Sequence, residues 1–419
     1  MSASVSRPSY VSVLREPHMA RVFAAALVGR FSYGVLFVAL MVTLTRAAGS
    51  YAWAGTAIAL FGLATVFLAP VRAGLVDRFG RRRVLLPMAA VYSALLGCLS
   101  LTAWRPGAPQ WALLALTLSA GACAPPLGPV MRALWSETFA KRPELRQRAF
   151  SLDTVCEELL YVLGPLVAGL FIVLGNAAAG VAASAVLVLG GTAAMVLGPA
   201  VDRPDDGPTG RAAAAAGQVR ASVPRDPVVV AAAVGFTLGA LNLLVVASAE
   251  HHGRLAAVSW LEAATAVGST VGGIVYGART WRLPGRARLP LFALALAVSL
   301  ALAGLAPGLL ALTAGVALVG LCVSPALATA YLAADESADP AGRVRAGAWV
   351  NSACNAGSSC GAAGVGLLLG GFPLRVCFAL AALPALTAAL AALPGLRRPA
   401  VSAPSPDRAG EPGPVARGA

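Results

Sequence analysis

A few charged and polar side chains stand inside long apolar stretches of this sequence, where an ionised group is costly to bury. Arg30 and Tyr33 are three positions apart in one such stretch, so that on a helix they share nearly the same face. At 1.5 Å per residue the helix from Arg21 to Arg30 would span ~13 Å, close to half of a ~30 Å hydrocarbon core. An arginine at that depth needs a carboxylate, an anionic substrate or a water-filled cavity. We take Arg30 and Tyr33 as candidate substrate-binding residues, with a fixed buried ion pair as the alternative.

Three acidic residues lie together near the start of a later apolar run. Asp153 and Glu157 have the i, i+4 spacing that places two side chains on one helical face, whereas Glu158 points elsewhere. Two close carboxylates repel each other, and such a pair favours holding a proton near neutral pH. Asp153 and Glu157 are therefore candidate proton-coupling residues. The alternative is simple ion pairing with the nearby arginines Arg132, Arg146 or Arg148.

Other polar positions extend this set. Glu262 is a lone carboxylate in an apolar run, and it is a third candidate proton-coupling residue. Asn351 and Asn355 form a polar stripe in a run near the C-terminus, and we expect this stripe to face a substrate cavity. No residue cluster predicts a catalytic centre, a metal site or a nucleotide-binding loop, so we expect neither an enzyme nor a cofactor.

The amino-acid composition indicates whether these apolar stretches are surrounded by water or by lipid. Hydrophobic residues make up 58% of the 419 residues and charged residues only 12%. A soluble domain is nearer to a quarter charged, because water must cover its surface. The net charge of +14 comes from basic residues that punctuate apolar runs, which disfavours a nucleic-acid-binding surface. The sequence therefore predicts an all-α membrane protein that crosses the bilayer many times.

Crossing a bilayer takes roughly 20 apolar residues per helix. We find twelve runs of that kind: 20–45, 51–71, 84–104, 109–131, 149–175, 178–200, 228–248, 255–277, 289–306, 308–333, 345–370 and 373–395. The longest polar, Pro/Gly/Ala-rich break between two runs predicts a linker between two six-helix halves. The expected organisation is a cytoplasmic N-terminus (1–19), an N-terminal six-helix bundle (20–200), a cytoplasmic linker (201–227), a C-terminal six-helix bundle (228–395) and a disordered cytoplasmic tail (396–419).

The basic residues are strongly asymmetric along this pattern. Nearly all 32 of them lie in the N-terminal segment, the even-numbered loops, the linker and the tail. The odd-numbered loops hold only Arg46, Arg105, Arg254 and Arg375. Because cytoplasmic loops of membrane proteins are enriched in arginine and lysine, the asymmetry predicts that both termini are cytoplasmic.

A shift of the sequence by 198 positions relates the two halves. It superimposes Asp153 on Asn351 and Glu157 on Asn355, and in a separate region Gly74 on Gly272. One shift that aligns two regions favours two parallel six-helix repeats, an arrangement used by transporters.

The loop after the second run carries the sequence GLVDRFGRRR, with Gly74, Asp77, Arg78, Gly80, Arg81 and Arg82 at characteristic positions. Together with the twelve runs, this loop resembles the loop 2–3 signature of the major facilitator superfamily of secondary transporters, in which leucine is usual at Val76. The resemblance implies two pseudo-symmetric six-helix bundles. It also implies that the loop latches the halves in one access state, with the start of the eleventh helix (343–348) as the partner of Asp77 and Arg78.

A second resemblance lies in the fifth run. Gly164, Pro165 and Gly169 match a Gly-Pro pattern of exporter branches of the same superfamily, although Ala168 replaces one glycine. Ordinary close packing of small residues is the alternative reading. The arginine that such exporters usually carry inside the fourth helix is missing, since the fourth run has no charge until Arg132 at its end.

These patterns predict a secondary active transporter in the cell membrane, of bacterial type, that works by alternating access. Its expected partners are a small-molecule substrate, protons and the lipid bilayer, but not nucleic acid, and we expect a monomer. Proton-coupled efflux is favoured by the fifth run. The alternatives are a proton-coupled uptake symporter for a small metabolite, and a non-transporting membrane receptor of the same fold.

Overall fold

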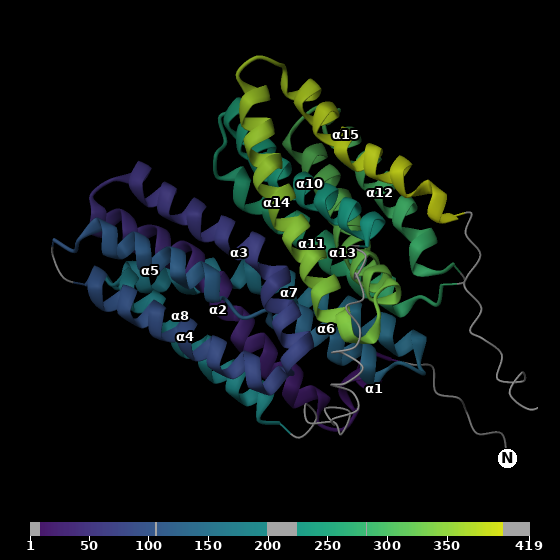
Figure 1. The fold of residues 1–419 in the computed structure, drawn as a ribbon. Coiled ribbons are helices and arrows are strands. Elements are labelled where there is room, and N and C mark those ends of the chain that lie inside the picture. Colours follow the sequence, from purple (N-terminus) through teal and green to yellow (C-terminus); the bar gives the residue numbers. More distant parts are fainter. Residues whose placement is uncertain (1–8, 105–106, 199–223, 282, 397–419) are drawn as a thin grey trace, which may run out of the picture.

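The computed structural model is nearly all helical, and it describes residues 9–104, 107–198, 224–281 and 283–396 (Figure 1). The helices of the first half are α1 (Tyr10–Leu14), α2 (Met19–Ala48), α3 (Tyr51–Phe79), α4 (Arg81–Ala103), α5 (Gln110–Cys123), α6 (Leu127–Thr138), α7 (Pro143–Val173) and α8 (Ala177–Val196). Those of the second half are α10 (Arg225–His251), α11 (Ala257–Ala278), α12 (Gly285–Ala303), α13 (Leu309–Ser337), α14 (Arg343–Leu369) and α15 (Leu374–Ala392).

Eleven helical segments of the described chain are long and apolar enough to cross a membrane, with α5 and α6 together making one of them. The twelfth long helix, α14, falls short of that apolar composition. Its polar stripe explains the shortfall, because Asn351 and Asn355 lie among several serines. The chain is thus a multi-pass membrane protein, and the prediction of an all-α membrane fold is confirmed.

The two halves repeat the same packing. In the first half α2 packs on α7, α3 on α5, and α4 on α8; in the second half α10 packs on α14, α11 on α13, and α12 on α15. These are equivalent pairs when the six crossings of each half are numbered in order. The predicted pair of pseudo-symmetric six-helix bundles is therefore confirmed. Figure 1 shows the first half in purple to teal beside the second half in green to yellow.

Backbone-to-backbone packing at glycines brings the central helices close together. A Cβ on Gly235 or Gly239 of α10 would overlap the carbonyls of α14, and one on Gly164 of α7 would overlap the backbone of Gly34 in α2. Small residues allow helices to approach closely in a membrane, where lipid supplies no hydrophobic drive for association. The helix pairs α10·α14 and α2·α7 are therefore in direct backbone contact.

The structure corrects the predicted loop at residues 72–83. α3 continues to Phe79 and α4 starts at Arg81, so that the loop is a single residue, Gly80. Gly80 has a φ of 89°, a backbone conformation that favours glycine. Asp77 and Arg78 therefore belong to the last turn of a helix.

The fourth run, expected as one helix over 109–131, is also corrected. It forms two helices, α5 and α6, separated at residues 124–126. Pro125 and Pro126 explain the break, because proline has no N–H to donate and its ring obstructs the preceding turn. Since α6 continues to Thr138, Arg132 lies inside the bundle with 2% of its surface exposed, not at the end of a span.

Several boundaries differ from the sequence prediction. α7 starts at Pro143, six positions before the expected 149, because its first turns extend beyond the apolar run. The predicted N-terminal segment contains the helix α1, and α10 starts at Arg225, inside the predicted linker. The remainder of that linker and almost all of the predicted tail lie outside the described residues.

Candidate functional site

A cavity of about 170 Å³ lies between the halves, lined by α2, α3, α7, the α5–α6 break and α14. Its polar lining includes Arg30, Tyr33, Arg72, Glu157, Asn351 and Asn355. The four residues predicted to bind substrate, which are Arg30, Tyr33, Asn351 and Asn355, thus meet on the wall of one cavity. Their role in binding stays a prediction, but their proximity depends on the rotation of two separate helices, α2 and α14.

Four ionisable side chains of the first half form one buried group, which we call the arginine–carboxylate cluster: Arg30, Arg132, Asp153 and Glu157. Arg30 lies 2.6 Å from Oδ1 of Asp153 and 3.1 Å from Oε2 of Glu157. Arg132 lies 2.9 Å from Oδ2 of Asp153 and also pairs with Glu157. Two positive and two negative charges leave the cluster neutral, which offsets the cost of removing them from water.

The two carboxylates of the cluster differ in exposure. Asp153 is fully buried, whereas 17% of the Glu157 side chain is exposed and lines the cavity. Of the three partners that the sequence left open, only Arg132 pairs with them; Arg146 and Arg148 lie elsewhere. The structure adds Arg30, which the sequence could not connect to α7 because the two lie on different helices.

The cluster reaches the second half through an aromatic ring. The guanidinium carbon of Arg132 lies 3.5 Å from the ring centroid of Tyr331 in α13. The Tyr331 hydroxyl donates to Oδ1 of Asn351 in α14 at 3.2 Å. A cation over an aromatic face is attracted by about 0.5–2 kcal/mol. The cluster of the first half is therefore in direct contact with α13 of the second half.

The break between α5 and α6 leaves backbone carbonyls without helical partners, and side chains of the first half bond to them. The Tyr33 hydroxyl donates to the Pro125 carbonyl at 2.6 Å. Arg72 donates to the carbonyls of Gly121 at 2.7 Å and Ala122 at 3.1 Å. Unsatisfied carbonyls in a membrane interior cost several kcal/mol each, so these bonds stabilise the break.

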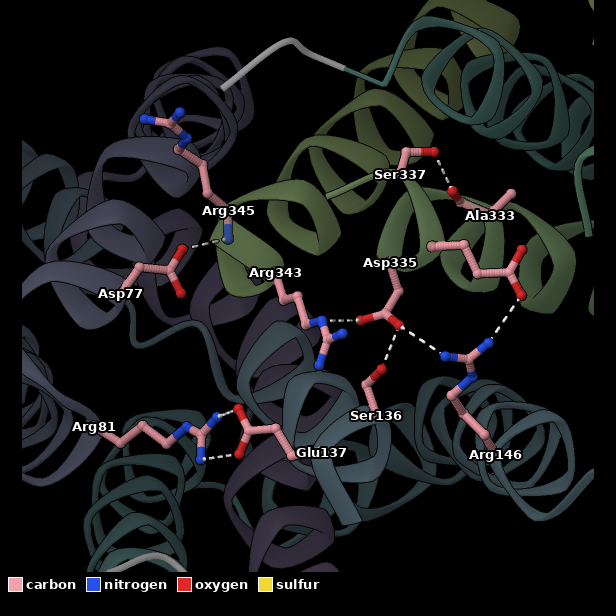
Figure 2. A network of polar contacts seen from close by, with 11 residues as sticks. Asp77, Arg81, Ser136, Glu137, Arg146, Ala333, Asp335, Ser337, Arg343 and Arg345 are labelled. Carbon is pink, nitrogen blue, oxygen red and sulfur yellow. Dashed lines mark hydrogen bonds and ion pairs between the residues drawn. The ribbon is translucent and has the colours of Figure 1, made fainter. Parts of the chain in front are cut away.

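At the end of the bundle that carries α1 and the end of α15, which we call the terminal end, polar contacts join the halves (Figure 2). The backbone N–H of Arg345, in the first turn of α14, donates to Oδ2 of Asp77 in α3 at 3.0 Å. The partner expected for Asp77 is therefore the observed one, although Arg78 instead lies over the ring of Phe79. The role of these residues as a latch stays a prediction.

Asp335 of α13 is the centre of a second group of contacts in Figure 2. It accepts a hydrogen bond from Ser136 of α6 and lies 3.6 Å from Arg343 and 3.9 Å from Arg146. Arg146 also pairs with Glu336 at 2.9 Å. Arg81, by contrast, pairs with Glu137 inside the first half.

Donors on α7 bond to carbonyls at the end of α11, which closes the terminal end further. Gln147 donates to the carbonyls of Tyr276 at 2.9 Å and Arg279 at 3.0 Å, and Arg148 donates to that of Ala278 at 3.2 Å. From α1, the Tyr10 hydroxyl donates to the Ile274 carbonyl at 2.7 Å. Burial raises the pKa of the Tyr10 phenol, so this donor stays protonated at physiological pH.

The remaining predicted residues lie apart from the cavity. Glu262 is exposed on α11, away from the cluster, whereas Glu158 accepts a hydrogen bond from Ser269. In the expected exporter pattern Gly164 makes a close helix contact, but a Cβ on Gly169 would meet nothing within 4 Å. No group of three metal-ligating side chains occurs among the described residues.

Sequence reasoning missed Arg72 and the depth of Arg132. The Pro-Pro step at 125–126 was a usable signal, because a break in the fourth span implies carbonyls that need donors. The break also implies that the fourth span ends beyond Arg132, so that Arg132 lies inside the span.

Comparisons with known proteins give a consistent result. A sequence model described as Major Facilitator Superfamily matches residues 22–249 and, separately, residues 227–417. No curated protein sequence matches.

Solved structures match over most of the chain. They include the human organic anion transporter MFSD10 (TETRAN), with 14% identity, a TM-score of 0.65 and coverage of 92% of this chain and 100% of that one. A bacterial homologue of the iron transporter ferroportin in an outward-facing state has 12% identity, a TM-score of 0.69 and coverage of 90% and 98%. The proton:xylose symporter XylE has 11% identity, a TM-score of 0.67 and coverage of 90% and 96%. At such identities these structures support the fold alone.

Proposed function

This chain belongs to the Major Facilitator Superfamily of secondary transporters, and from that premise we propose that it exports a small molecule in exchange for protons. The observation that carries the proposal is the position of the arginine–carboxylate cluster on the wall of the cavity. Glu157 faces the cavity while it pairs with Arg30 and Arg132. Protonation of Glu157 would neutralise one of two carboxylates and leave two arginines with one partner. The freed positive charge then favours a different arrangement of the cluster.

We place the terminal end in the cytoplasm of a cell whose plasma membrane holds the protein, because the arginines gather at that end. The hydrogen bonds and ion pairs between the halves that are described above lie at or on the terminal side of the Glu158–Ser269 contact. That distribution supports an outward-facing state, in which the cavity exchanges with the external solution. Since one chain encloses the cavity, a monomer suffices for transport.

Alternating access couples this chemistry to transport. In the outward-facing state Glu157 takes a proton from outside, and the terminal end then opens as the contacts at Asp77 and Asp335 break. The substrate enters from the cytoplasm and the proton leaves there. Return to the outward-facing state completes the exchange. The Gly-Pro pattern at Gly164 and Pro165 supports export over import.

Reconstituted protein tests this proposal. Liposomes with an internal pH-sensitive dye are exposed to a panel of amphipathic carboxylates, amines and neutral amides, with and without a pH gradient. We expect at least one compound to drive proton movement opposite in direction to its own. Glu157→Gln should keep substrate exchange but lose proton movement. The same change at exposed Glu262 should leave both substrate exchange and proton movement intact.

The outcomes separate the alternatives. Protons that move in the same direction as the compound indicate an uptake symporter. Substrate flux that does not depend on the pH gradient would refute the proton coupling in this proposal. Binding without flux indicates a receptor that retains the fold.

A further inference from the structure

Arg72 is buried although it lies near the terminal end of α3, where a long side chain could reach water. Only 5% of its surface is exposed. Its guanidinium turns toward the bilayer centre: Nη2 donates to the Thr65 carbonyl, two turns back along the helix, at 2.7 Å. Nη1 donates to the carbonyls of Gly121 and Ala122. An arginine normally extends toward the nearer water phase, so this direction needs a reason.

The charge of Arg72 has no counter-ion among the residues that the structure describes. Arg30 and Arg132 each pair with two carboxylates, but in the described part of the chain no carboxylate pairs with Arg72. Its titratable neighbours are Tyr33, Tyr92 and Cys123, and its Nε has no hydrogen-bond partner within the described ranges. Backbone carbonyls accept hydrogen bonds from its Nη1 and Nη2 groups but leave a full positive charge buried. A buried charge without a partner is costly and tends to mark function.

Arg72 lies on the wall of the transport cavity, together with the neutral cluster. Because the cluster contributes no net charge, Arg72 makes the cavity electropositive. Phe37, Ile58 and Phe61 form apolar parts of the same wall. The cavity therefore fits a molecule with one anionic group and an apolar body.

We propose that Arg72 determines substrate specificity by binding the anionic group, a carboxylate or a chemically similar oxyanion, of an amphipathic substrate. The inference rests on the proposed transport function and adds its substrate class. Stabilising the α5–α6 break is the competing role for Arg72, since the same carbonyls explain its N–H bonds. That role requires donors but no substrate charge, so charge-matched probes distinguish the two.

The test uses full-length purified protein in detergent and three probes with the same ring: benzoate, benzamide and benzylamine. We expect benzoate to raise the unfolding temperature saturably, whereas the neutral and cationic probes do not. Arg72→Gln should weaken benzoate binding by about tenfold or more, because it removes a charge-assisted contact. Arg83→Gln is the matched control, since Arg83 is exposed and outside the cavity.

Arg72→Lys keeps the charge but not the fork of donors. If Arg72→Lys binds benzoate more tightly than Arg72→Gln does, the proposal is supported. If Arg72→Gln fails to fold, benzoate binding by folded Arg72→Lys serves as the test in its place. Equal response of the wild-type protein to all three probes, no saturable response to benzoate, or a folded Arg72→Lys that has lost benzoate binding would overturn the proposal. The assay needs neither a gradient nor transport. Proton-independent flux with intact benzoate binding would therefore refute the proposed coupling and leave this inference standing.

Discussion

Asp77 of the first half and Arg345 of the second half are joined by a hydrogen bond from backbone nitrogen to carboxylate, 3.0 Å long. The donor belongs to the first turn of α14, whose N–H groups have no partner within the helix. A carboxylate at this position also interacts favourably with the helix dipole. This contact therefore stabilises the closed terminal end independently of the side chain at position 345.

Removing that carboxylate should open the terminal end. A hydrogen bond to a charged group contributes about 1.5–3 kcal/mol, so Asp77→Ala should shift the conformational equilibrium by about tenfold or more. Electron–electron distances between spin labels at Lys141 and Arg286, both exposed, would measure the shift in a cysteine-free background. Glu137→Ala is the control, since its ion pair with Arg81 stays within one half. Equal opening in both variants would contradict a latch at Asp77.

The arginine–carboxylate cluster should behave as one energetic unit. Asp153→Asn leaves a buried charge unpaired, which costs about 3–5 kcal/mol, and should lower the unfolding temperature strongly. Glu157→Gln should cost less, because Glu157 is partly exposed to the cavity. The double variant Arg30→Gln with Asp153→Asn removes one charge of each sign, and we expect it to be more stable than Asp153→Asn alone. If the two effects simply add, the cluster is not coupled.

The two glycines of the expected exporter pattern should respond differently to the same change. A Cβ at Gly164 would overlap the backbone of Gly34, which cannot move aside as a side chain can. Overpacking of this kind costs about 1–3 kcal/mol or more, so Gly164→Ala should reduce folded yield and transport. Gly169→Ala should retain both, because nothing lies within 4 Å of its added methyl group. Transport lost equally in both variants would show that the pattern acts through something other than helix contact.

The N-terminal helix should help to close the terminal end. Tyr10→Phe removes only the hydroxyl that donates to Ile274, a contact that contributes about 0.5–1.5 kcal/mol. We therefore expect a smaller opening than for Asp77→Ala, measured with the same spin labels. Val11→Ala on the same helix is the control, since Val11 is exposed. Unchanged distances in Tyr10→Phe would assign α1 no part in closure.

The sequence was sufficient for the fold because lipid imposes strong rules on composition. Apolar runs, arginine asymmetry and the glycine-marked loop each depend on local residues, so they are readable without coordinates. The partner of Asp77 was also predicted without coordinates, because the family resemblance implied it. Helix ends were less predictable, because α7 continues through Arg146 and Arg148 beyond the hydrocarbon core.

The site was only partly predictable, because helix rotation and breaks decide which side chains meet. Arg30 and Asp153 are far apart in sequence, and no periodicity indicates that α2 and α7 turn these residues toward each other. Arg72 was harder still, since its partners are carbonyls released by a break in another span. Recognising Arg72 requires knowledge of that break first, and then the observation that no carboxylate in the described part of the chain balances its charge.

The contacts between α7 and α11 have a consequence for evolution. The donors are side chains on α7, but the acceptors at Tyr276, Ala278 and Arg279 are main-chain oxygens. Substitution cannot delete an oxygen that every amino acid carries. Tyr276 is held in place by its buried side chain, whose hydroxyl accepts from Arg288 and Thr329. The exposed residues Ala278 and Arg279 are therefore free to diverge among descendants of this gene while these contacts persist, whereas Gln147 and Arg148 are not.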